Sequence, residues 1–117
     1  NLQTAIVKYI QLKYPHIRYC ASLGGIRTSF KQAIKAKATG YVKGFPDLQI
    51  CEARGNYFGL FLEIKQEKKY ATKEQKQWIE DLSARGYKAL IVKGLENSIT
   101  ALDEYLSLSK TKTCRCD

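Results

Sequence analysis

The first 46 residues of this 117-residue chain contain no aspartate and no glutamate. They carry eight of its 20 lysines and arginines, whereas the rest of the chain holds twelve bases and all eleven acids. The net charge of +9 is therefore concentrated in the N-terminal part. Such asymmetry indicates a polyanionic partner, and nucleic acid is the class that fits best. The alternative is a lysine-rich surface kept for solubility.

The chain also lacks long apolar runs and an opening leader. No stretch approaches the roughly 18 apolar residues of a membrane span, and no basic-then-apolar segment marks it for secretion. We therefore expect an intracellular protein with no membrane partner. A single histidine, His16, and a Cys-x-Cys at Cys114 and Cys116 do not match the usual spacing of zinc ligands. The four cysteines are expected to be reduced.

Length and 44% hydrophobic content fit one globular domain, which we place at residues 1–109, followed by a polar C-terminal tail at 110–117. Periodicity and turn residues predict the order helix, strand, short helix, strand, strand, helix, strand, helix. The predicted strands are residues 17–22, 47–53, 57–65 and 87–92. This order predicts an α/β fold, with helices packed on a small mixed sheet.

Two of the predicted helices have clear start signals. Ser29 is expected to cap a short basic helix in which Phe30 and Ile34 face inward while the lysines face out. Thr72-Lys73-Glu74-Gln75 has the pattern of a capping box.

The stretch GFPDLQICEARGNYFGLFLEIKQ, residues 44–66, predicts a hairpin around Arg54-Gly55-Asn56. Alternation along the second strand places Glu63 and Lys65 on the same face. If the turn is a three-residue loop, Asp47 lies directly opposite Glu63, on that face. A two-residue loop would place the two acids on opposite faces.

Two like charges directly opposed in a hairpin are destabilising and need compensation. Lys65 alone, a proton shared by the carboxylates and a divalent cation are three alternatives. Hard oxygen ligands suit Mg²⁺ or Mn²⁺, which commonly bind substrate phosphate as well. The hairpin and the charge distribution together favour metal-assisted phosphodiester chemistry, and the alternative is a surface cluster of charges without a function.

The sequence resembles the virus-type replication-repair nuclease (VRR-NUC) branch of the PD-(D/E)xK nucleases. Four blocks in order carry the resemblance: Gly24-Gly25-Ile26-Arg27, Gly44-Phe45-Pro46-Asp47-Leu48, Glu63-Ile64-Lys65 and Gln75-Lys76-Gln77-Trp78. The resemblance covers nearly the whole chain except the tail and implies a restriction-endonuclease-like core.

The same resemblance implies roles for individual residues. Asp47, Glu63 and the main-chain carbonyl of Ile64 would ligate Mg²⁺ or Mn²⁺. Lys65 would orient or help to deprotonate the attacking water and steady charge on the phosphate. Gln75 has two compatible roles, as the last member of the capping box and as a side chain near the metal or the water.

One departure concerns the first helix, where the family usually has a glutamate that completes the metal site. This chain has the neutral Gln3 near that position, and the alternative is a glutamate that precedes Asn1. The number of bound ions and the metal affinity depend on this difference.

Small stand-alone relatives resemble the Holliday-junction resolving enzymes of phages and archaea, which act as homodimers. The resemblance therefore implies a structure-selective DNA endonuclease that acts on four-way junctions. It also implies a homodimer with two active sites. If a phage encodes the protein, it would act in the host cell. The alternatives are a flap or end-processing nuclease, and a nuclease-derived DNA-binding module. The bases expected to contact backbone phosphates are Arg27, Lys31, Lys35, Lys37, Lys43, Lys68, Lys69 and Lys73.

Overall fold

The computed structural model describes residues 1–22 and 29–111. The elements are α1 (Leu2–Lys13), β1 (Tyr19–Ala21), α2 (Phe30–Ala38), β2 (Leu48–Ile50), β3 (Leu60–Lys65), α3 (Lys73–Ala84), β4 (Lys88–Lys93) and α4 (Gly94–Leu106). The strands form one sheet in the order β1-β2-β3-β4, with β3 and β4 parallel and the other pairs antiparallel. The predicted element order and mixed sheet are confirmed, although the first three predicted strands extend beyond the observed ones.

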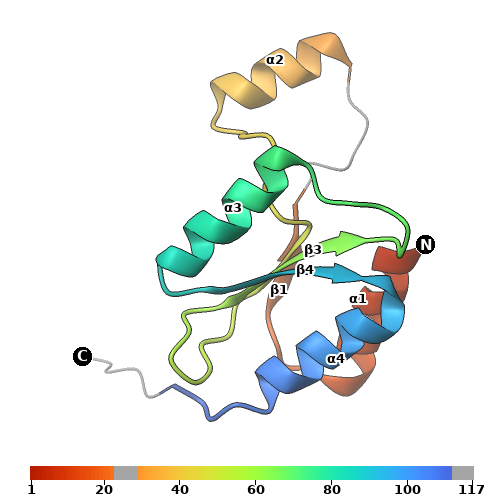
Figure 1. Cartoon of the computed structure of the whole chain (residues 1–117), viewed down its shortest axis with the longest axis vertical. Helices are drawn as coiled ribbons and strands as arrows, with labels where there is room; N and C mark the ends of the chain where they lie inside the picture. Colours follow the sequence, from red (N-terminus) through yellow and green to blue (C-terminus); the bar gives the residue numbers. More distant parts are fainter. Residues whose placement is uncertain (23–28, 112–117) are drawn as a thin grey trace.

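Helices cover both faces of the sheet: α1 and α4 lie on one side and α3 on the other (Figure 1). Leu60 and Leu62 of β3 point into the larger core between the sheet and the α1–α4 pair. Phe61 points the other way, into the smaller core under α3. Because side chains alternate along a strand, Glu63 and Lys65 share the α3 side with Phe61.

The hairpin has the predicted register where the strands pair. Leu48 of β2 is the partner of Leu62 of β3. One step further out, the same register sets Asp47 opposite Glu63.

The tip of the hairpin differs from the prediction. Arg54 and Tyr57 donate main-chain hydrogen bonds to each other's carbonyls, at 3.2 and 2.9 Å, so the turn is the two-residue Gly55-Asn56. Between this turn and the paired strands, three residues (51–53) face only two residues (58–59) on the other strand. The one extra residue, like that of a β-bulge, shifts the pairing by one position. The strands therefore keep the register that a regular two-residue hairpin would have lost.

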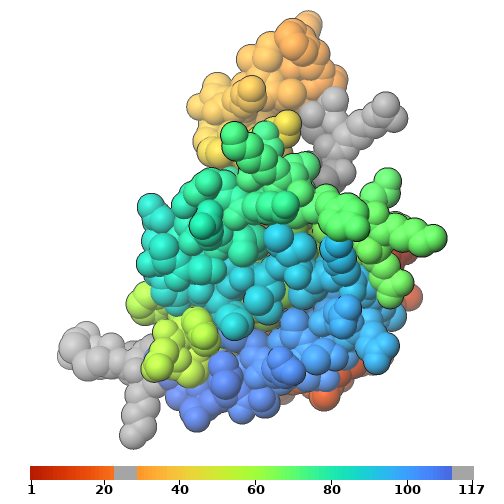
Figure 2. All heavy atoms as spheres, viewed as in Figure 1, coloured from red at the N-terminus to blue at the C-terminus, as the bar shows by residue number. Residues whose placement is uncertain are grey.

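Helix α2 stands apart from the sheet and the other helices (Figures 1 and 2). Ser29 caps it and forms a complete capping box with Gln32, which confirms the predicted start. The expectation that Phe30 and Ile34 face inward is wrong, because they are 81% and 54% exposed. The two side chains do share one helical face, but no element within residues 1–22 and 29–111 buries it.

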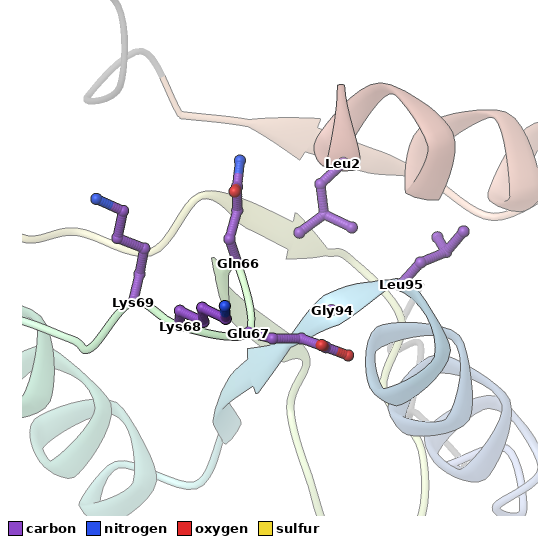
Figure 3. A pocket seen from close by; sticks show the side chains of 7 residues that line it. All are labelled: Leu2, Gln66, Glu67, Lys68, Lys69, Gly94 and Leu95. Carbon is purple, nitrogen blue, oxygen red and sulfur yellow. The ribbon is translucent and has the colours of Figure 1, made fainter.

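The N-termini of α1 and α4 meet the loop that follows β3, around a cavity of about 440 Å³ (Figure 3). Leu2, residues 66–69 and the start of α4 line this cavity. The side chain of Glu67 points to Gly94, where an added Cβ would lie 3.0 Å from Glu67 Oε1. A carboxylate is stabilised by the positive end of a helix dipole. The Glu67 carboxylate therefore lies at the N-terminus of α4, where its charge is favourable and where Lys93 provides no side-chain cap.

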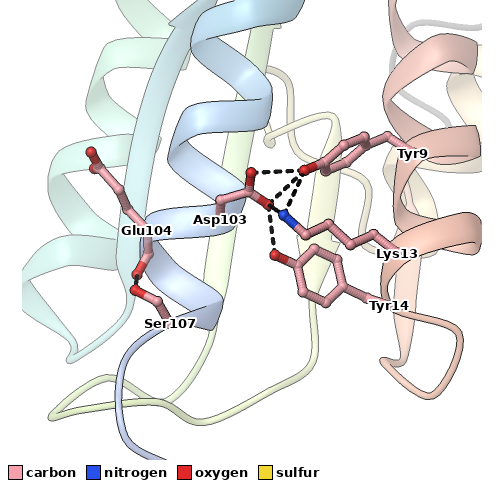
Figure 4. Close-up of polar contacts among 6 residues, drawn as sticks. All are labelled: Tyr9, Lys13, Tyr14, Asp103, Glu104 and Ser107. Carbon is pink, nitrogen blue, oxygen red and sulfur yellow. Dashed lines mark hydrogen bonds and ion pairs between the residues drawn. The ribbon is translucent and has the colours of Figure 1, made fainter.

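Asp103 of α4 joins α4 to α1 (Figure 4). It accepts hydrogen bonds from the hydroxyls of Tyr14 at 2.6 Å and Tyr9 at 2.7 Å, and lies 3.2 Å from Lys13 Nζ. Burial pushes the pKa of Asp103 upward, but the bonds from Tyr14, Tyr9 and Lys13 outweigh it, so the pKa is lowered overall. The charged carboxylate fixes α1 against α4.

The chain beyond α4 returns to the hairpin tip. Gly55 donates its N–H to the Ser109 carbonyl at 2.8 Å, and Thr111 Oγ1 donates to the Gly55 carbonyl at 2.9 Å. The remaining tail, residues 112–117, lies outside the described residues, as do the two cysteines within it. Cys20 and Cys51 are free and exposed. Among the described residues, no helix combines the length and the hydropathy of a membrane span.

Candidate active site

The segment that leads into β2 is packed tightly against the start of α3. Gly44 has a φ of 95°, and an added Cβ would lie 2.8 Å from a main-chain carbon of Glu74. Trp78 Nε1 donates a hydrogen bond to the Lys43 carbonyl at 3.1 Å. The ring of Phe45 packs edge-on against Trp78, with centroids 5.0 Å apart. Glycine is therefore required for the close approach that delivers the following residues to the sheet.

Asp47 is held by two strands at once. Its side-chain Oδ2 accepts a hydrogen bond from the Ile64 N–H at 2.8 Å. Its main-chain carbonyl accepts one from the Ser22 N–H at 2.9 Å. In the hairpin register Ile64 faces Pro46, which has no N–H to offer. The Asp47 side chain thus extends the contact between strands beyond the end of β2.

Glu63 is a buried acid, only 1% exposed. Its Oε1 has no hydrogen-bond partner within the described ranges. Burial, followed by a hydrogen bond with Asp47 and its negative charge, raises the pKa of Glu63 to about 8, although the Lys65 ammonium acts in the opposite direction. Lys65 Nζ lies 3.9 Å from Glu63 Oε2. The structure therefore brings Asp47, Glu63 and Lys65 together on the α3 side of the sheet.

This arrangement fits a divalent cation. A buried carboxylate oxygen without a donor, next to a second carboxylate, is the hard oxygen environment that Mg²⁺ or Mn²⁺ prefers. No group of three or more His, Cys, Asp or Glu side chains that could hold a metal is found among residues 1–22 and 29–111. Magnesium commonly uses only one or two protein carboxylates and fills its other positions with water and substrate oxygens. A proton shared between the acids also fits the raised pKa of Glu63.

Gln75 completes the predicted capping box at the start of α3. Its Oε1 accepts the Thr72 N–H at 2.8 Å, and its own N–H donates to Thr72 Oγ1 at 3.2 Å. The capping role is therefore confirmed, and a role at the metal or water stays a prediction. Gln3 lies in the first turn of α1 and has no hydrogen bond to Asp47 or Glu63 in the part of the chain that is described.

The predicted phosphate-contacting bases fall on separate segments. Lys31, Lys35 and Lys37 lie on α2, Lys43 precedes β2, Lys68 and Lys69 follow β3, and Lys73 begins α3. All seven are exposed, and both α2 and the loop after β3 project from the body of the molecule (Figure 2). Arg27 and the glycine-rich block at residues 24–27 lie outside the described residues.

One pair near the site was not predicted from the sequence. Lys93 ends β4 and is the cross-strand partner of Lys65. Its Nζ lies 3.8 Å from the centre of the Tyr70 ring. The parallel register aligns Glu63-Ile64-Lys65 with Ile91-Val92-Lys93. The sequence carries no signal for this pairing, because the pairing depends on which strand lies next to β3.

The mixed sheet carries an acid before β2 and the Glu-x-Lys of β3 beside it, which is the residue pattern that gives the PD-(D/E)xK class of nucleases its name. The chain belongs to the VRR-NUC family: the model of the VRR-NUC domain matches residues 4–96. A solved structure described as a VRR_NUC domain protein is 32% identical, with a TM-score of 0.78 over 95% of this chain and 89% of that chain. No curated protein matches the chain. Membership of this family implies a nuclease, and nucleases of this type usually use divalent metal ions.

Proposed function

We propose that the protein is a divalent-metal-dependent DNA endonuclease selective for branched structures, similar to a Holliday-junction resolvase, that acts inside the cell. The observation that carries the proposal is the buried Oε1 of Glu63, which lacks a donor in the described part of the chain and lies beside Asp47 and Lys65. A buried carboxyl oxygen without a hydrogen bond is costly. Such a cost is retained where function requires it.

Asp47 and Glu63 would hold the cation through their carboxylates. The N–H and carbonyl of a strand residue point to the same neighbouring strand, so the Ile64 carbonyl is directed to the Asp47 side and would add a third oxygen. When bound, the cation supplies Lewis-acid activation of water and neutralises charge on the phosphate.

Lys65 would act on the reacting groups directly. In the hydrolysis, the water oxygen forms a bond to phosphorus, the bond to the leaving ester oxygen breaks, the water loses a proton and the leaving oxygen gains one. The Lys65 ammonium, whose side chain is 18% exposed, would orient the water and balance charge on the phosphate. Gln75, at the start of α3, would help to orient the same water.

The DNA would be held by sequence-independent contacts with backbone phosphates. The support is the acid-free N-terminal part and the exposed lysines on α2, before β2 and after β3. Such contacts read the shape of a branched molecule rather than its bases.

We propose a homodimer as the active form, because paired cuts on the symmetric strands of a four-way junction need paired sites. The exposed face of α2 supports this proposal, since Phe30 and Ile34 are large apolar side chains held in solvent. Sedimentation of the protein and of a Phe30→Ser, Ile34→Ser variant tests it. A wild type that stays monomeric at the concentrations where it cuts junctions would rule it out.

A second candidate is a DNA-binding module that no longer cuts. The observation that favours it is that only two carboxylates meet in the described site, with the neutral Gln3 in the first helix. A flap or end-processing nuclease would share the site and differ in substrate.

Cleavage of a labelled four-way junction, compared with flap and linear DNA, tests all of these candidates. We expect cleavage of the junction with Mg²⁺ or Mn²⁺ and none with chelator. Asp47→Asn keeps an oxygen for the Ile64 N–H but loses the charge, so it should bind the junction without cutting it. Glu80→Gln, a change at an exposed acid of α3, is the matched control and should cut normally. Cleavage retained by Asp47→Asn would reject the assigned site.

A further inference from the structure

Tyr70 is an exposed aromatic residue in the loop between β3 and α3. Its side chain is 78% exposed, and its hydroxyl has no hydrogen bond to any described residue. The ring is instead held through one face, by Lys93 Nζ at 3.8 Å from its centre. Exposed lysines stand on the same loop, at Lys68 and Lys69. The loop thus presents an exposed aromatic ring with the Lys93 ammonium over one face and two further lysines nearby.

This ring lies next to the candidate active site. Lys93 and Lys65 are cross-strand partners in β4 and β3, so their side chains leave the sheet on the same face, from strands about 4.8 Å apart. Glu63 is on this face too, with Lys65 Nζ 3.9 Å from its Oε2. Two lysines side by side repel each other. The Asp47–Glu63 pair lies beside the first of them, and the Tyr70 ring compensates the second.

The geometry points to Tyr70 as a stacking platform for one unpaired nucleotide base next to the phosphate that is cut, with Lys93 positioning the ring. This inference rests on the proposed function and deepens it by naming what the enzyme reads. Base–aromatic stacking needs no particular base, since every base has a π face. Arg or Lys below an aromatic ring leaves the opposite face available for such a contact.

A platform of this kind selects for DNA structure. In a continuous duplex each base is already stacked on both sides, so stacking on Tyr70 requires a base to leave the helix. Bases at a branch point, in a flap or at a frayed end have lost part of their stacking and pay less to reach the ring. Tyr70 would therefore favour branched or single-stranded positions over uninterrupted duplex without reading sequence.

The test is binding of fluorescent four-way junctions in metal-free buffer, with abasic sites placed one at a time along the strand that crosses the branch point. For the wild type, one position should weaken binding by about 5- to 150-fold, the range that corresponds to the stacking of one base. Tyr70→Ala should weaken binding of the intact junction by a similar factor and should no longer respond to that abasic position. Tyr70→Phe should behave like the wild type, because the hydroxyl has no part in the contact.

Phe58 offers a matched control, as a 67% exposed aromatic residue that precedes β3, at the opposite end of the strand from Lys65. Phe58→Ala should leave the abasic profile unchanged. Two results for Tyr70→Ala would overturn the inference. The first is binding of the intact junction within about twofold of the wild type. The second is an equal loss of affinity for junction and continuous duplex, with the response to the abasic position retained. The binding assay contains no metal and does not depend on cleavage. A failure to cut junctions in the cleavage assay would therefore count against the proposed function alone, and the binding result would still decide the stacking inference.

Discussion

Replacing Glu63 by glutamine is expected to stabilise the metal-free protein increasingly as the pH rises. Burial, followed by the hydrogen bond and charge of Asp47, raises the pKa of Glu63 from its ordinary 4.5 to about 8. Between these values the folded protein keeps a proton that the unfolded chain has released. The associated stability is complete below pH 4.5 and is lost as the pH rises through 8. Glutamine has a similar shape and no charge to bury.

The size of this effect follows from the pKa difference. One pKa unit corresponds to about 1.4 kcal/mol, so the whole difference corresponds to about 5 kcal/mol once both states are ionised. Between about pH 5 and about pH 9, the wild type should lose roughly 4 kcal/mol of unfolding free energy through this group alone. The advantage of Glu63→Gln over the wild type should grow by the same amount across this range.

Urea unfolding of both proteins in chelator, at a series of pH values, measures the effect directly. Comparing the two proteins at each pH cancels the other titrating groups. Glu80→Gln, the same substitution at an exposed acid of α3, is the matched control and should not show the Glu63→Gln advantage. Adding Mn²⁺ at alkaline pH should stabilise the wild type, because a ligand that binds the folded state shifts the equilibrium, and should leave Glu63→Gln unchanged. A Glu63→Gln advantage that stays constant within about 1 kcal/mol over the pH series would refute the reasoning about burial and charge.

Three further predictions concern other parts of the molecule. Gly44→Ala should lower the free energy of unfolding by about 1–3 kcal/mol, because the added methyl group overpacks against α3. Gly40→Ala is the control for backbone strain, since Gly40 has a similar φ of 109° but open space around it, and should cost less. Equal costs for the two variants would contradict the overpacking. Asp103→Ala should cost about 1–3 kcal/mol by leaving hydroxyl donors without their acceptor. Because the pKa of Asp103 is lowered, this contribution should disappear from the wild type as the pH falls through that pKa, and a cost that persists in acid would argue against it. Lys31→Gln with Lys35→Gln should reduce the slope of log affinity against log salt by about 2 if both contact phosphates; an unchanged slope would remove α2 from the interface.

The sequence is most informative where the interactions are local. Thr72 and Gln75 stand three residues apart and satisfy each other's main-chain groups, so their pattern alone predicts the start of α3. The same holds for Ser29 at the start of α2. Neither cap needs a partner from a distant part of the chain.

The hairpin shows a correct register reached through a different turn. Leu48 and Ile50 on β2, with Leu60 and Leu62 on β3, must all face the larger core, and a slip of one residue would turn them to the other face. Burial of these side chains therefore fixes the pairing. The turn length is free to differ because one extra residue between tip and strand absorbs the mismatch.

Features that depend on distant partners could not be predicted. The spacing of Phe30 and Ile34 shows that they share a helical face, but a period carries no information on whether another element covers that face. The pairing of Lys93 with Lys65 depends on which strand lies next to β3. Only the assembled sheet reveals that pairing, and with it the position of Tyr70.

The double attachment of Asp47 has a consequence for the entropy cost of the proposed cation binding. Its carbonyl is tied to Ser22 and its Oδ2 to the Ile64 N–H, so the side chain gives up its rotational freedom when the protein folds. A ligand already immobilised in this way adds little further entropy loss when it coordinates. In the proposed site, the folding of the sheet rather than the arrival of the cation would be the step that orders the Asp47 ligand.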